Sequence, residues 1–352
     1  MSPVAADRRA VSDMFVLAHL SDPHLAPLPR PRPSALASKR LLGYLNWRRS
    51  RHRIHRAEVL DAVTRDLHAA RPDHIAVTGD LINIALPSEF EAARRWLDAL
   101  GAPADVSVVP GNHDAYVAEA ALYGERHWEP YMTGDREAPT APSPLVGEGR
   151  GGGSGGNRTL VPHTTTPTPD PSPQAGGEKT AFPYLRRRGP VALVGLSTAV
   201  ATPLFMATGE LGREQIARAA KLLGELRDAN AFRVVMIHHP PVAPASAHHK
   251  RLIDAAAFRE AIAAVGAELV IHGHDHVHAL GWLAGNEGRV PVVGVPSASA
   301  CAGMKHHAAA CNLYAVGGGP GAWSCEVVSR GLSASGAVEE INRFALSWSG
   351  HE

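Results

Sequence analysis

The first apolar run of the chain leads directly into acid and imidazole side chains: residues 15–24 read FVLAHLSDPH. Its apolar part, residues 15–20, predicts a buried strand. Asp22 and His24 follow two positions apart, so in an extended backbone both side chains project to the same side. In α/β proteins, sites form where strands end and loops begin. The segment therefore predicts a sheet that carries polar side chains at one edge.

The same alternation of buried runs and helical stretches continues along the chain. Six further runs predict strands, at residues 75–78, 106–109, 191–196, 234–237, 269–271 and 290–295. Helical apolar spacing occurs at residues 56–70, 88–100, 213–229 and 254–265. Ser88 and Glu91 have the spacing of a capping box for the second of these helices. Runs at residues 312–316 and 323–328 lack a helix between them, which predicts antiparallel strands in a mixed sheet.

One region interrupts this pattern. Residues 134–180 are dominated by Gly, Pro, Ser and Thr and have almost no apolar periodicity, which predicts a disordered insertion. A phosphate-binding glycine loop is excluded there, because neither G-K-S nor G-K-T follows the glycines. The 352 residues are long enough for a sizeable core. We predict one domain over residues 14–330, broken by this insertion, and a C-terminal extension, residues 331–352, in which a helix is one option.

Charge and cysteine content exclude several protein classes. The formal net charge is +1, so no broad basic track exists for a nucleic-acid polymer. The three cysteines have no C-x-x-C spacing and an odd number, which favours a reducing compartment. No long apolar leader or membrane span is present, so a cytoplasmic location is expected. The unusual feature is histidine: its 20 residues exceed the 7 Phe, 6 Trp and 6 Tyr combined.

Several of these histidines follow the predicted strands together with other oxygen and nitrogen donors. The groups are Asp22-Pro23-His24, Gly79-Asp80, Gly111-Asn112-His113-Asp114, His238-His239-Pro240 and Gly273-His274-Asp275-His276. Thiolates are absent from all of them. Such donors suit transition-metal ions, and each pair spaced by two could clasp one ion. His272 and His278 are expected to flank the site, and His248, His249, His306 and His307 to lie in solvated loops.

The series D-x-H, G-D, G-N-H-D, H-x-P and G-H-x-H resembles the calcineurin-like metallophosphoesterase family, in order and residue type, over about residues 15 to 300. The resemblance implies a four-layer αββα sandwich of two mixed β-sheets flanked by helices, the metallo-dependent phosphatase fold. It also implies two metal ions. One would be held by Asp22, His24 and His276, the other by Asn112, His238 and His274, with Asp80 bridging them. His239 stays open as an alternative to His238.

Paired cations suit the hydrolysis of phosphoesters. Two ions about 3.5–4 Å apart lower the pKa of a bridging water and neutralise the phosphoryl oxygens. His113 adjoins a ligand and could protonate the leaving oxygen, while Asp114 could fix the tautomer of that ring. The donors allow Mn, Fe, Zn or Co without choosing among them. We therefore predict hydrolysis of a phosphodiester by a metal-bridging hydroxide. The D-P-H, HHPP and PSAS phrases look most like the cyclic-nucleotide phosphodiesterase branch.

Residues 39–56 carry seven Lys or Arg and no acid, interleaved with Leu, Tyr, Trp and Ile. This pattern is typical of a solvated helix packed on a core, but it also suits a cap whose arginines hold a phosphate or diphosphate. Peripheral contact with an anionic membrane is a third interpretation. The segment favours an alternative function, a pyrophosphatase acting on a nucleotide diphospho-sugar lipid of the UDP-diacylglucosamine type.

A scaffold that keeps the fold without catalysis is the non-enzyme alternative, and the complete set of motifs argues against it. The expected partner is a small phosphoester. The loop at residues 295–303, VPSASACAG, either lines the substrate cleft or makes a tight turn. The sequence predicts neither the physiological substrate nor the oligomeric state.

Overall fold

The computed structural model describes residues 14–135, 182–242, 248–303 and 307–349. These residues belong to one compact unit, formed by the chain up to Asp135 and from Thr180 onward. The predicted insertion lies almost wholly outside the described residues. The strands are β1 (Phe15–Leu20), β2 (His74–Val77), β3 (Val106–Val108), β4 (Tyr184–Arg188), β5 (Val191–Gly195), β6 (Phe232–Met236), β7 (Leu269–His272), β8 (Ala279–Gly285), β9 (Gly288–Gly294), β10 (Ala310–Gly319), β11 (Ala322–Leu332) and β12 (Val338–Ala345).

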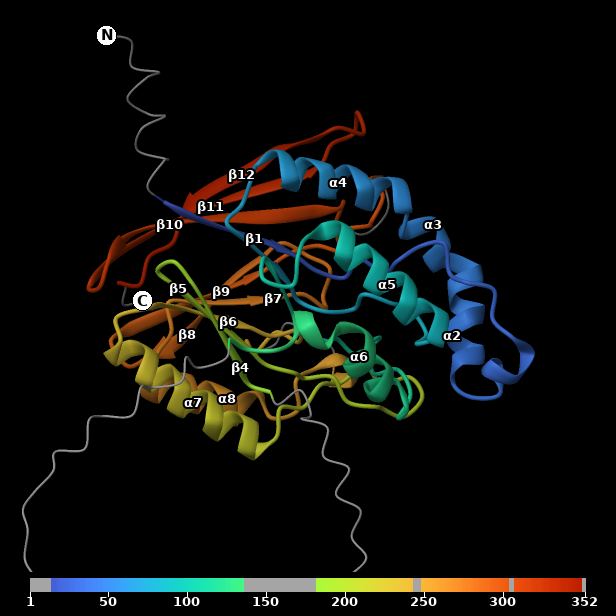
Figure 1. Ribbon diagram of the computed structural model, residues 1–352, viewed down its shortest axis with the longest axis horizontal. Helices are drawn as coiled ribbons and strands as arrows, with labels where there is room; N and C mark the ends of the chain where they lie inside the picture. The colour runs from blue at the N-terminus through green and yellow to red at the C-terminus, as the bar shows by residue number, and fades with distance from the viewer. Residues whose placement is uncertain (1–13, 136–181, 243–247, 304–306, 350–352) are drawn as a thin grey trace, which may run out of the picture. The chain divides into compact units, whose positions relative to one another are not determined.

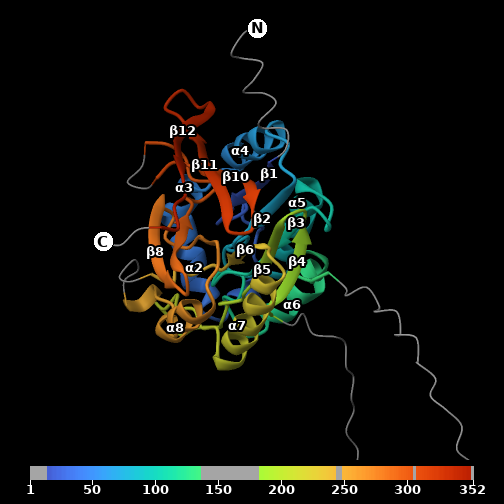
Figure 2. The same ribbon diagram turned by 90° about the vertical axis from the view of Figure 1, so that its left-hand side faces the viewer.

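The strands form two mixed sheets of six (Figures 1 and 2). The first has the order β12-β11-β10-β1-β2-β3, in which β1, β2 and β3 are parallel and β10 pairs antiparallel with β1. The second has the order β4-β5-β6-β7-β9-β8, in which β5, β6, β7 and β9 are parallel. Within each sheet, the parallel strands therefore deliver their carboxyl ends to one edge.

Helices cover the outer faces of both sheets. α4 (Ala57–Ala69) contacts the first sheet along β10, β11 and β12, and α5 (Pro87–Leu100) packs beside α6 (Ala120–Trp128). α7 (Arg213–Asp228) and α8 (Ala255–Val265) contact each other and the second sheet. Figure 1 shows α7 and α8 on the side opposite α4 and α5. The chain thus has the predicted four layers of two mixed sheets between helices.

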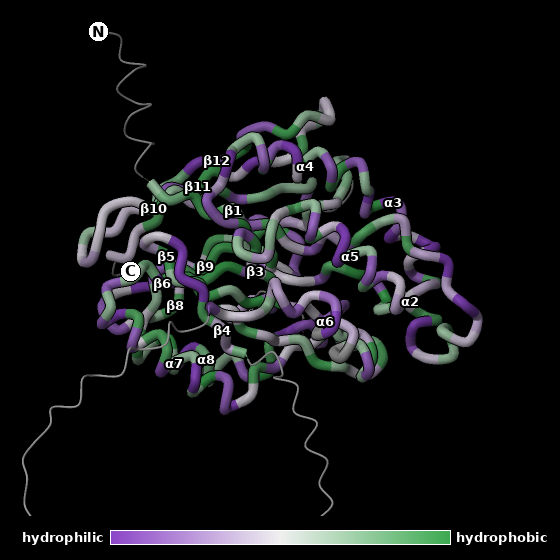
Figure 3. Tube along the Cα trace, in the orientation of Figure 1, coloured by the Kyte–Doolittle hydropathy of each residue, from purple (hydrophilic) through white to green (hydrophobic). Residues whose placement is uncertain are grey.

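The central strands of the second sheet are largely apolar on both faces because both faces are covered. Along β6, Val234 belongs to the core between the two sheets, whereas its neighbour Val235 packs with Leu223 of α7 and Phe258 of α8. All five residues of β5 and of β6 are buried. In Figure 3 the central strands accordingly form continuous hydrophobic stretches of the tube.

Two local predictions from the sequence are wrong. Helix α5 begins at Pro87, and Glu89 rather than Glu91 accepts a hydrogen bond from the backbone of the capping residue, Leu86. Ser88 lies inside the helix. The C-terminal segment forms a strand, β12, that pairs antiparallel with β11, so the helical option for residues 331–352 is wrong.

The segment that the sequence marks as basic and apolar folds into short helices: α2 (Arg40–Asn46), a π-helical turn (Trp47–Arg51) and α3 (His52–Ile54). They connect β1 to α4. Within the described ranges, no helix has both the length and the apolar character needed to cross a bilayer.

Candidate metal centre

The loops after five parallel strands meet at one place between the sheets. Those of the first sheet follow β1, β2 and β3, and those of the second follow β6 and β7. Backbone hydrogen bonds join neighbouring loops, for example from the Asp22 N–H to the Gly79 carbonyl at 2.9 Å. The seven predicted ligand residues come together there: Asp22, His24, Asp80, Asn112, His238, His274 and His276.

The first half of the centre contains two imidazoles and a carboxylate. His24 donates from Nδ1 to the Ile82 carbonyl at 3.1 Å, which leaves the lone pair on Nε2. His24 Nε2 lies 3.3 Å from Nε2 of His276. The same His276 nitrogen lies 3.0 Å from Oδ1 of Asp22. Oδ2 of Asp80 is 3.8 Å from Nε2 of His24.

The second half shares Asp80. His238 donates from Nδ1 to the Thr78 carbonyl at 2.6 Å, so Nε2 is the nitrogen that faces the site. This atom lies 3.4 Å from Oδ2 of Asp80 and 3.3 Å from Oδ1 of Asn112. Nε2 of the buried His274 has no hydrogen-bond partner among the described residues. One oxygen of Asp80 therefore faces both halves.

These positions fit two metal ions. Ligand atoms about 2.0–2.2 Å from an ion, at tetrahedral or octahedral angles, are roughly 3.0–3.4 Å apart. The pairs His24–His276, His276–Asp22, His238–Asp80 and His238–Asn112 span 3.0–3.4 Å. A buried lone pair without a donor is unfavourable, and a cation at His274 would remove that cost. Nitrogen and oxygen donors without sulfur suit transition metals.

The charges of the site attract cations. Burial alone would raise the pKa of Asp80, yet the neighbouring His238 and His113 hold it well below its usual range. Burial alone would lower the pKa of His238, but the Asp80 charge raises it to about 10, so an ion bound at Nε2 would displace a proton from this ring. Burial lowers the pKa of His274, which keeps that ring neutral, as a ligand must be.

The backbone of the site is strained. Five of the nine non-glycine residues with positive φ in the described ranges are predicted ligands, namely Asp22, His24, Asp80, His274 and His276. Such conformations cost roughly 1–3 kcal/mol each and cluster at functional sites. Gly273 relieves crowding there, since a Cβ at this position would clash with Ser21 Oγ and Asp22 Oδ2.

His239 is close enough to His238 and His274 to share an ion with them. Its two ring nitrogens are nevertheless engaged: Nδ1 accepts from Thr198 Oγ1 at 2.7 Å and Nε2 donates to the Ala207 carbonyl at 3.1 Å. Its ring packs against His274, with centroids 4.3 Å apart. The hydrogen bonds therefore favour His238 as the ligand and His239 as support for the His274 ring.

His113 lies beside the shared carboxylate. Its backbone N–H donates to Oδ1 of Asp80 at 2.7 Å, and its Nδ1 donates to the Asn83 carbonyl. Nε2 accepts from the Arg51 guanidinium at 2.9 Å. Burial, followed by the Arg51 charge, lowers the pKa of His113 to about 4.

The predicted role of Asp114 in fixing the His113 tautomer differs from the observed contacts. Its two carboxylate oxygens accept backbone N–H groups, one from Ile82 at 3.2 Å and one from Gly111 at 2.8 Å. The carbonyl of Asn83 orients the His113 ring instead. Asp114 thus shapes the loops from which the ligands project, and burial and the Asp80 charge raise its pKa.

Sequence reasoning did not single out two residues that organise this site. Arg51 reaches in from the π-helical turn and donates from Nη2 to Nε2 of His24 at 3.0 Å. The basic character of its segment was visible, but not which arginine enters. Buried Glu89 accepts from the backbone of Asn83 at 2.8 Å, which fixes the carbonyl that holds His113. No sequence pattern marks Glu89 apart from other acids.

The basic segment combines two of the predicted interpretations. Arg40 is buried and donates to the carbonyls of Ile84 and Ala85, which fastens α2 to the core. Leu41, Leu42 and Leu45 are exposed on the same helix. The segment is therefore anchored through Arg40 and presents Arg51 to the metal centre.

A cavity of about 430 Å³ opens onto the centre and is lined by Arg51, Asp80, His113 and Lys250, among others. An adjoining hollow of about 480 Å³, called the apolar groove, is lined by Leu42, Tyr116, Leu204, Phe205 and Met206. Three residues, Asn46, Ala207 and Lys250, line both the groove and the metal cavity. The loop at residues 295–303 packs against the centre, since Ser297 Oγ donates to the Asp22 carbonyl at 2.6 Å.

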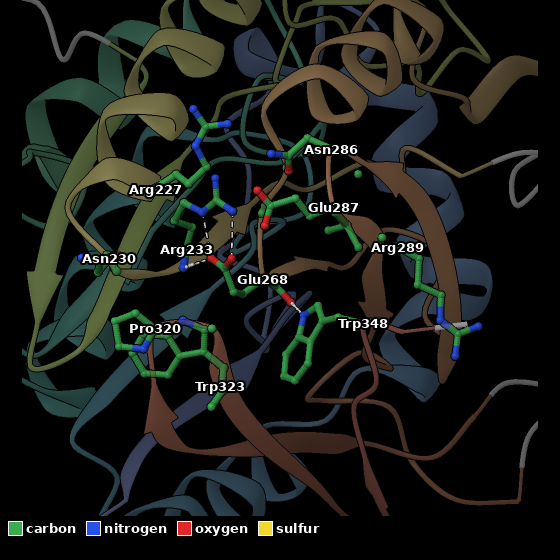
Figure 4. Close-up of a pocket in the computed structure, with 18 of the residues that line it drawn as sticks. Arg227, Asn230, Arg233, Glu268, Asn286, Glu287, Arg289, Pro320, Trp323 and Trp348 are labelled. Atoms are coloured by element: carbon green, nitrogen blue, oxygen red, sulfur yellow. Dashed lines mark hydrogen bonds and ion pairs between the residues drawn. The ribbon is translucent and has the colours of Figure 1, made fainter. Parts of the chain in front are cut away.

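A larger hollow of about 560 Å³ lies elsewhere, at the amino ends of β6 and β7 (Figure 4). Its buried charges pair with each other. The Arg233 guanidinium binds both oxygens of Glu268, each at 2.8 Å, and Trp348 donates from Nε1 to the Glu268 carbonyl at 2.7 Å. In this hollow, called the Arg233 hollow, these bonds join β6 to the start of β7 and to the C-terminal segment.

The remaining histidines lie mostly as expected. His248 and His249 are exposed, His278 packs beside His307, and His306 lies outside the described residues. His272 is buried beside the site, and its Nδ1 donates to the Gly273 carbonyl at 3.0 Å.

The family model described as calcineurin-like phosphoesterase matches residues 15–278, which contain every residue of the two half-sites. The chain belongs to this family. Its fold is similar to that of a dimetal phosphatase from Danio rerio, with 13% identity and a TM-score of 0.52 over 96% of this chain and 100% of that one. It is also similar to the purple acid phosphatase PPD1 of yellow lupin (Lupinus luteus), with 12% identity and a TM-score of 0.54 over 95% of this chain and 54% of that one.

A short stretch is similar to a curated enzyme. Over 44 residues the chain is 46% identical to the glycerophosphodiester phosphodiesterase GpdQ of Enterobacter lignolyticus (strain SCF1). The match spans 12% of this chain and 15% of that enzyme.

Proposed function

We propose that the protein is a metal-dependent phosphodiesterase that acts on a small, cyclic-nucleotide-like diester. The observation that carries the proposal is the position of Asp80: its Oδ2 faces the donors of both half-sites, and its Oδ1 holds the backbone of His113. A shared carboxylate between two sets of nitrogen and oxygen donors suits a pair of cations. Membership of a phosphoesterase family supports the reaction class.

Two bound transition-metal ions, of Mn, Fe, Zn or Co, would supply a nucleophile near neutral pH and neutralise the phosphoryl oxygens. The other steps fall to the chain. His113 is held through Nδ1 by the Asn83 carbonyl and presents Nε2 to the cavity. When the Arg51 guanidinium pairs with the substrate, its charge no longer disfavours a proton on this ring, and Nε2 takes up the proton that it gives to the leaving oxygen.

Arg51 and Lys250 supply the cationic side chains that bind the phosphate. His24 Nε2 has a single lone pair, which accepts the Arg51 hydrogen bond in the structure. If an ion were held there, the guanidinium would be released to pair with the substrate. Lys250 lines both the metal cavity and the apolar groove.

A diester substrate has two supports. The curated relative that matches over a short stretch is a phosphodiesterase by name. The D-P-H, HHPP and PSAS phrases, which resemble the cyclic-nucleotide branch, surround the centre: Ser297 of the last phrase binds the Asp22 carbonyl. A cavity of about 430 Å³ has room for a nucleotide-sized ligand.

The apolar groove favours a second candidate, a pyrophosphatase that acts on a nucleotide diphospho-sugar lipid. Phe205 is 83% exposed at its rim, and Leu42 and Leu204 are also exposed. Exposed apolar side chains next to a phosphate site suit an acyl chain. Helix α2, which contributes Leu42 to the groove, also suits peripheral contact with an anionic membrane. Its exposed Leu41 and Leu45 would enter the lipid surface, and Arg48 and Arg49 of the next helical turn would contact the anionic headgroups.

A substrate panel separates these candidates. Purified protein with quantified metal is assayed with cyclic AMP, bis(4-nitrophenyl) phosphate, 4-nitrophenyl phosphate and a nucleotide diphospho-sugar lipid. The proposal predicts turnover of the two diesters with little turnover of the monoester. Hydrolysis of the lipid-linked diphosphate alone would replace it by the second candidate. Absence of both metal and turnover would favour a scaffold.

A further inference from the structure

One imidazole at the metal centre comes from outside the five sequence motifs. His55 follows α3 directly and is 3% exposed, yet it lines the metal cavity. It enters the site from the basic segment, whereas the motif residues follow strands. Nothing in its sequence surroundings marks it as a ligand.

The ring of His55 lies against two imidazoles of the first half-site. Its centroid is 4.5 Å from that of His24 and 5.7 Å from that of His276. One ring nitrogen from each of the three residues lies within 4.8 Å of the other two. Three imidazoles thus converge, and nitrogen atoms so spaced can share one ion.

Hydrogen bonds fix the orientation of His55. Nδ1 lies 2.9 Å from Ser299 Oγ and 3.4 Å from Ser297 Oγ. The backbone forms an antiparallel bridge with Ala300, and the next residue, Arg56, donates to the Ser299 carbonyl at 3.0 Å. Histidines that bind metals use their second nitrogen for such a partner, which sets the tautomer and the ring orientation. Because Nδ1 bonds to Ser299, Nε2 is the nitrogen assigned to the ion.

We propose that His55 is a further ligand of the transition-metal ion assigned to Asp22, His24 and His276. The inference rests on the dinuclear centre of the proposed function and adds a residue to one half only. This ion then has three imidazoles, the Asp22 carboxylate and the shared Asp80. A neutral fifth donor strengthens binding without adding negative charge that would repel a phosphoester.

The alternative is that His55 only packs on His24 and ties residues 54–56 to the loop of Ser299. Two substitutions separate the roles. In His55→Asn the side-chain amide occupies the place of Nδ1 and keeps the Ser299 hydrogen bond, but nothing reaches the position of Nε2. In His55→Gln the terminal amide reaches that position and can donate or coordinate there. His68→Asn is the matched control, since His68 is exposed on α4.

The test measures the binding of Co²⁺ alone, by equilibrium dialysis with metal analysis and by the visible d–d spectrum of the complex. Wild type and His68→Asn should bind two Co²⁺ ions. His55→Asn should weaken one of the two binding steps by at least about tenfold, the lower end of the effect of removing even an outer-shell partner. It should also change the d–d intensity of that ion, and His55→Gln should recover much of the affinity.

The outcomes separate this inference from the proposed function. If wild type binds two Co²⁺ ions and both steps are unchanged in His55→Asn, then His55 is not a ligand, although the dinuclear centre stands. Wild type that binds fewer than two ions would overturn the dinuclear centre itself. Melting of each variant without added metal checks the fold: equal melting temperatures for wild type and His55→Asn support ligation as the cause of any loss.

Discussion

The metal centre and the Arg233 hollow lie at opposite ends of the parallel strands of the second sheet, and they differ in how their polar groups are satisfied. In the Arg233 hollow, Arg233 and Glu268 form a bidentate pair. At the metal centre, the Nε2 atoms of His24, His238 and His276 point toward one another or toward carboxylates. The first arrangement is complete as it stands, whereas the second needs cations.

The comparison also concerns size and strain. The Arg233 hollow is the larger, at about 560 Å³ against 430 Å³. The metal centre holds five ligand residues in positive-φ conformations. Volume is therefore a poor guide to chemistry here, and unsatisfied donors on a strained backbone are a better one.

The largest expected effect comes from removing the carboxylate that both half-sites share. Asp80→Ala should abolish binding of both metal ions and lower turnover of a diester by at least about 10³-fold, because the electrostatic stabilisation supplied by the ions is lost. Metal analysis of the purified variant and a diester assay measure the two effects. Retention of two ions with full activity would show that Asp80 is not the bridge.

The next effect separates proton transfer from metal binding. His113→Ala should keep both ions and lower turnover of substrates with poor leaving groups by about 10²–10⁴-fold. An activated ester with a nitrophenolate leaving group needs less protonation and should lose much less. Rates on an alkyl diester and on bis(4-nitrophenyl) phosphate give the comparison. An equal loss on both esters would contradict the assigned role.

A smaller effect is expected at the cation beside the metals. Arg51→Met should raise KM for a diester by roughly tenfold, the size of one lost charge-assisted hydrogen bond, with a smaller change in kcat. Arg49→Met is the control, since Arg49 is exposed on the same helical turn. Steady-state kinetics of both variants decide the matter. An unchanged KM in Arg51→Met would place the phosphate elsewhere.

The smallest effect on turnover is predicted for the Arg233 hollow. Arg233→Met leaves Glu268 unpaired and should cost about 3 kcal/mol of unfolding free energy, since the pair is largely buried. Turnover and metal content should be unchanged well below the melting temperature. The double variant Arg233→Met, Glu268→Met should recover stability, because a matched apolar pair can replace a buried ion pair. Loss of turnover in a folded single variant would make the hollow part of the site.

Local pattern predicted the strands, the helices and the places of the motif residues at strand ends. Within each sheet, parallel strands bring their carboxyl ends to one edge, so the loops after β1, β2 and β3 lie together, as do those after β6 and β7. The four-layer arrangement that joins the two sets was predicted from the family resemblance. Glycines beside several motifs were a further local signal of a crowded site. Gly273, for example, leaves the room that the Asp22 carboxylate occupies.

Residues that depend on contacts between distant segments could not be predicted in this way. His55 acts where residues 54–56 meet residues 299–301, about 240 positions later in the chain. Asp114 seemed the natural partner of His113 because the two are adjacent, but adjacent side chains on a tight turn diverge, and the Asn83 carbonyl takes that place. Strand β12 has few buried residues, so the exposed edge of β11 determines its structure more than its own pattern does.

The central claim is that two metal ions flank Asp80, and anomalous diffraction from a crystal soaked in Mn²⁺ tests it most directly. The account predicts two anomalous peaks about 3.5–4 Å apart, one beside His24 and His276 and one beside His238 and His274. A single peak, or strong peaks only beside Glu268 in the Arg233 hollow, would contradict it.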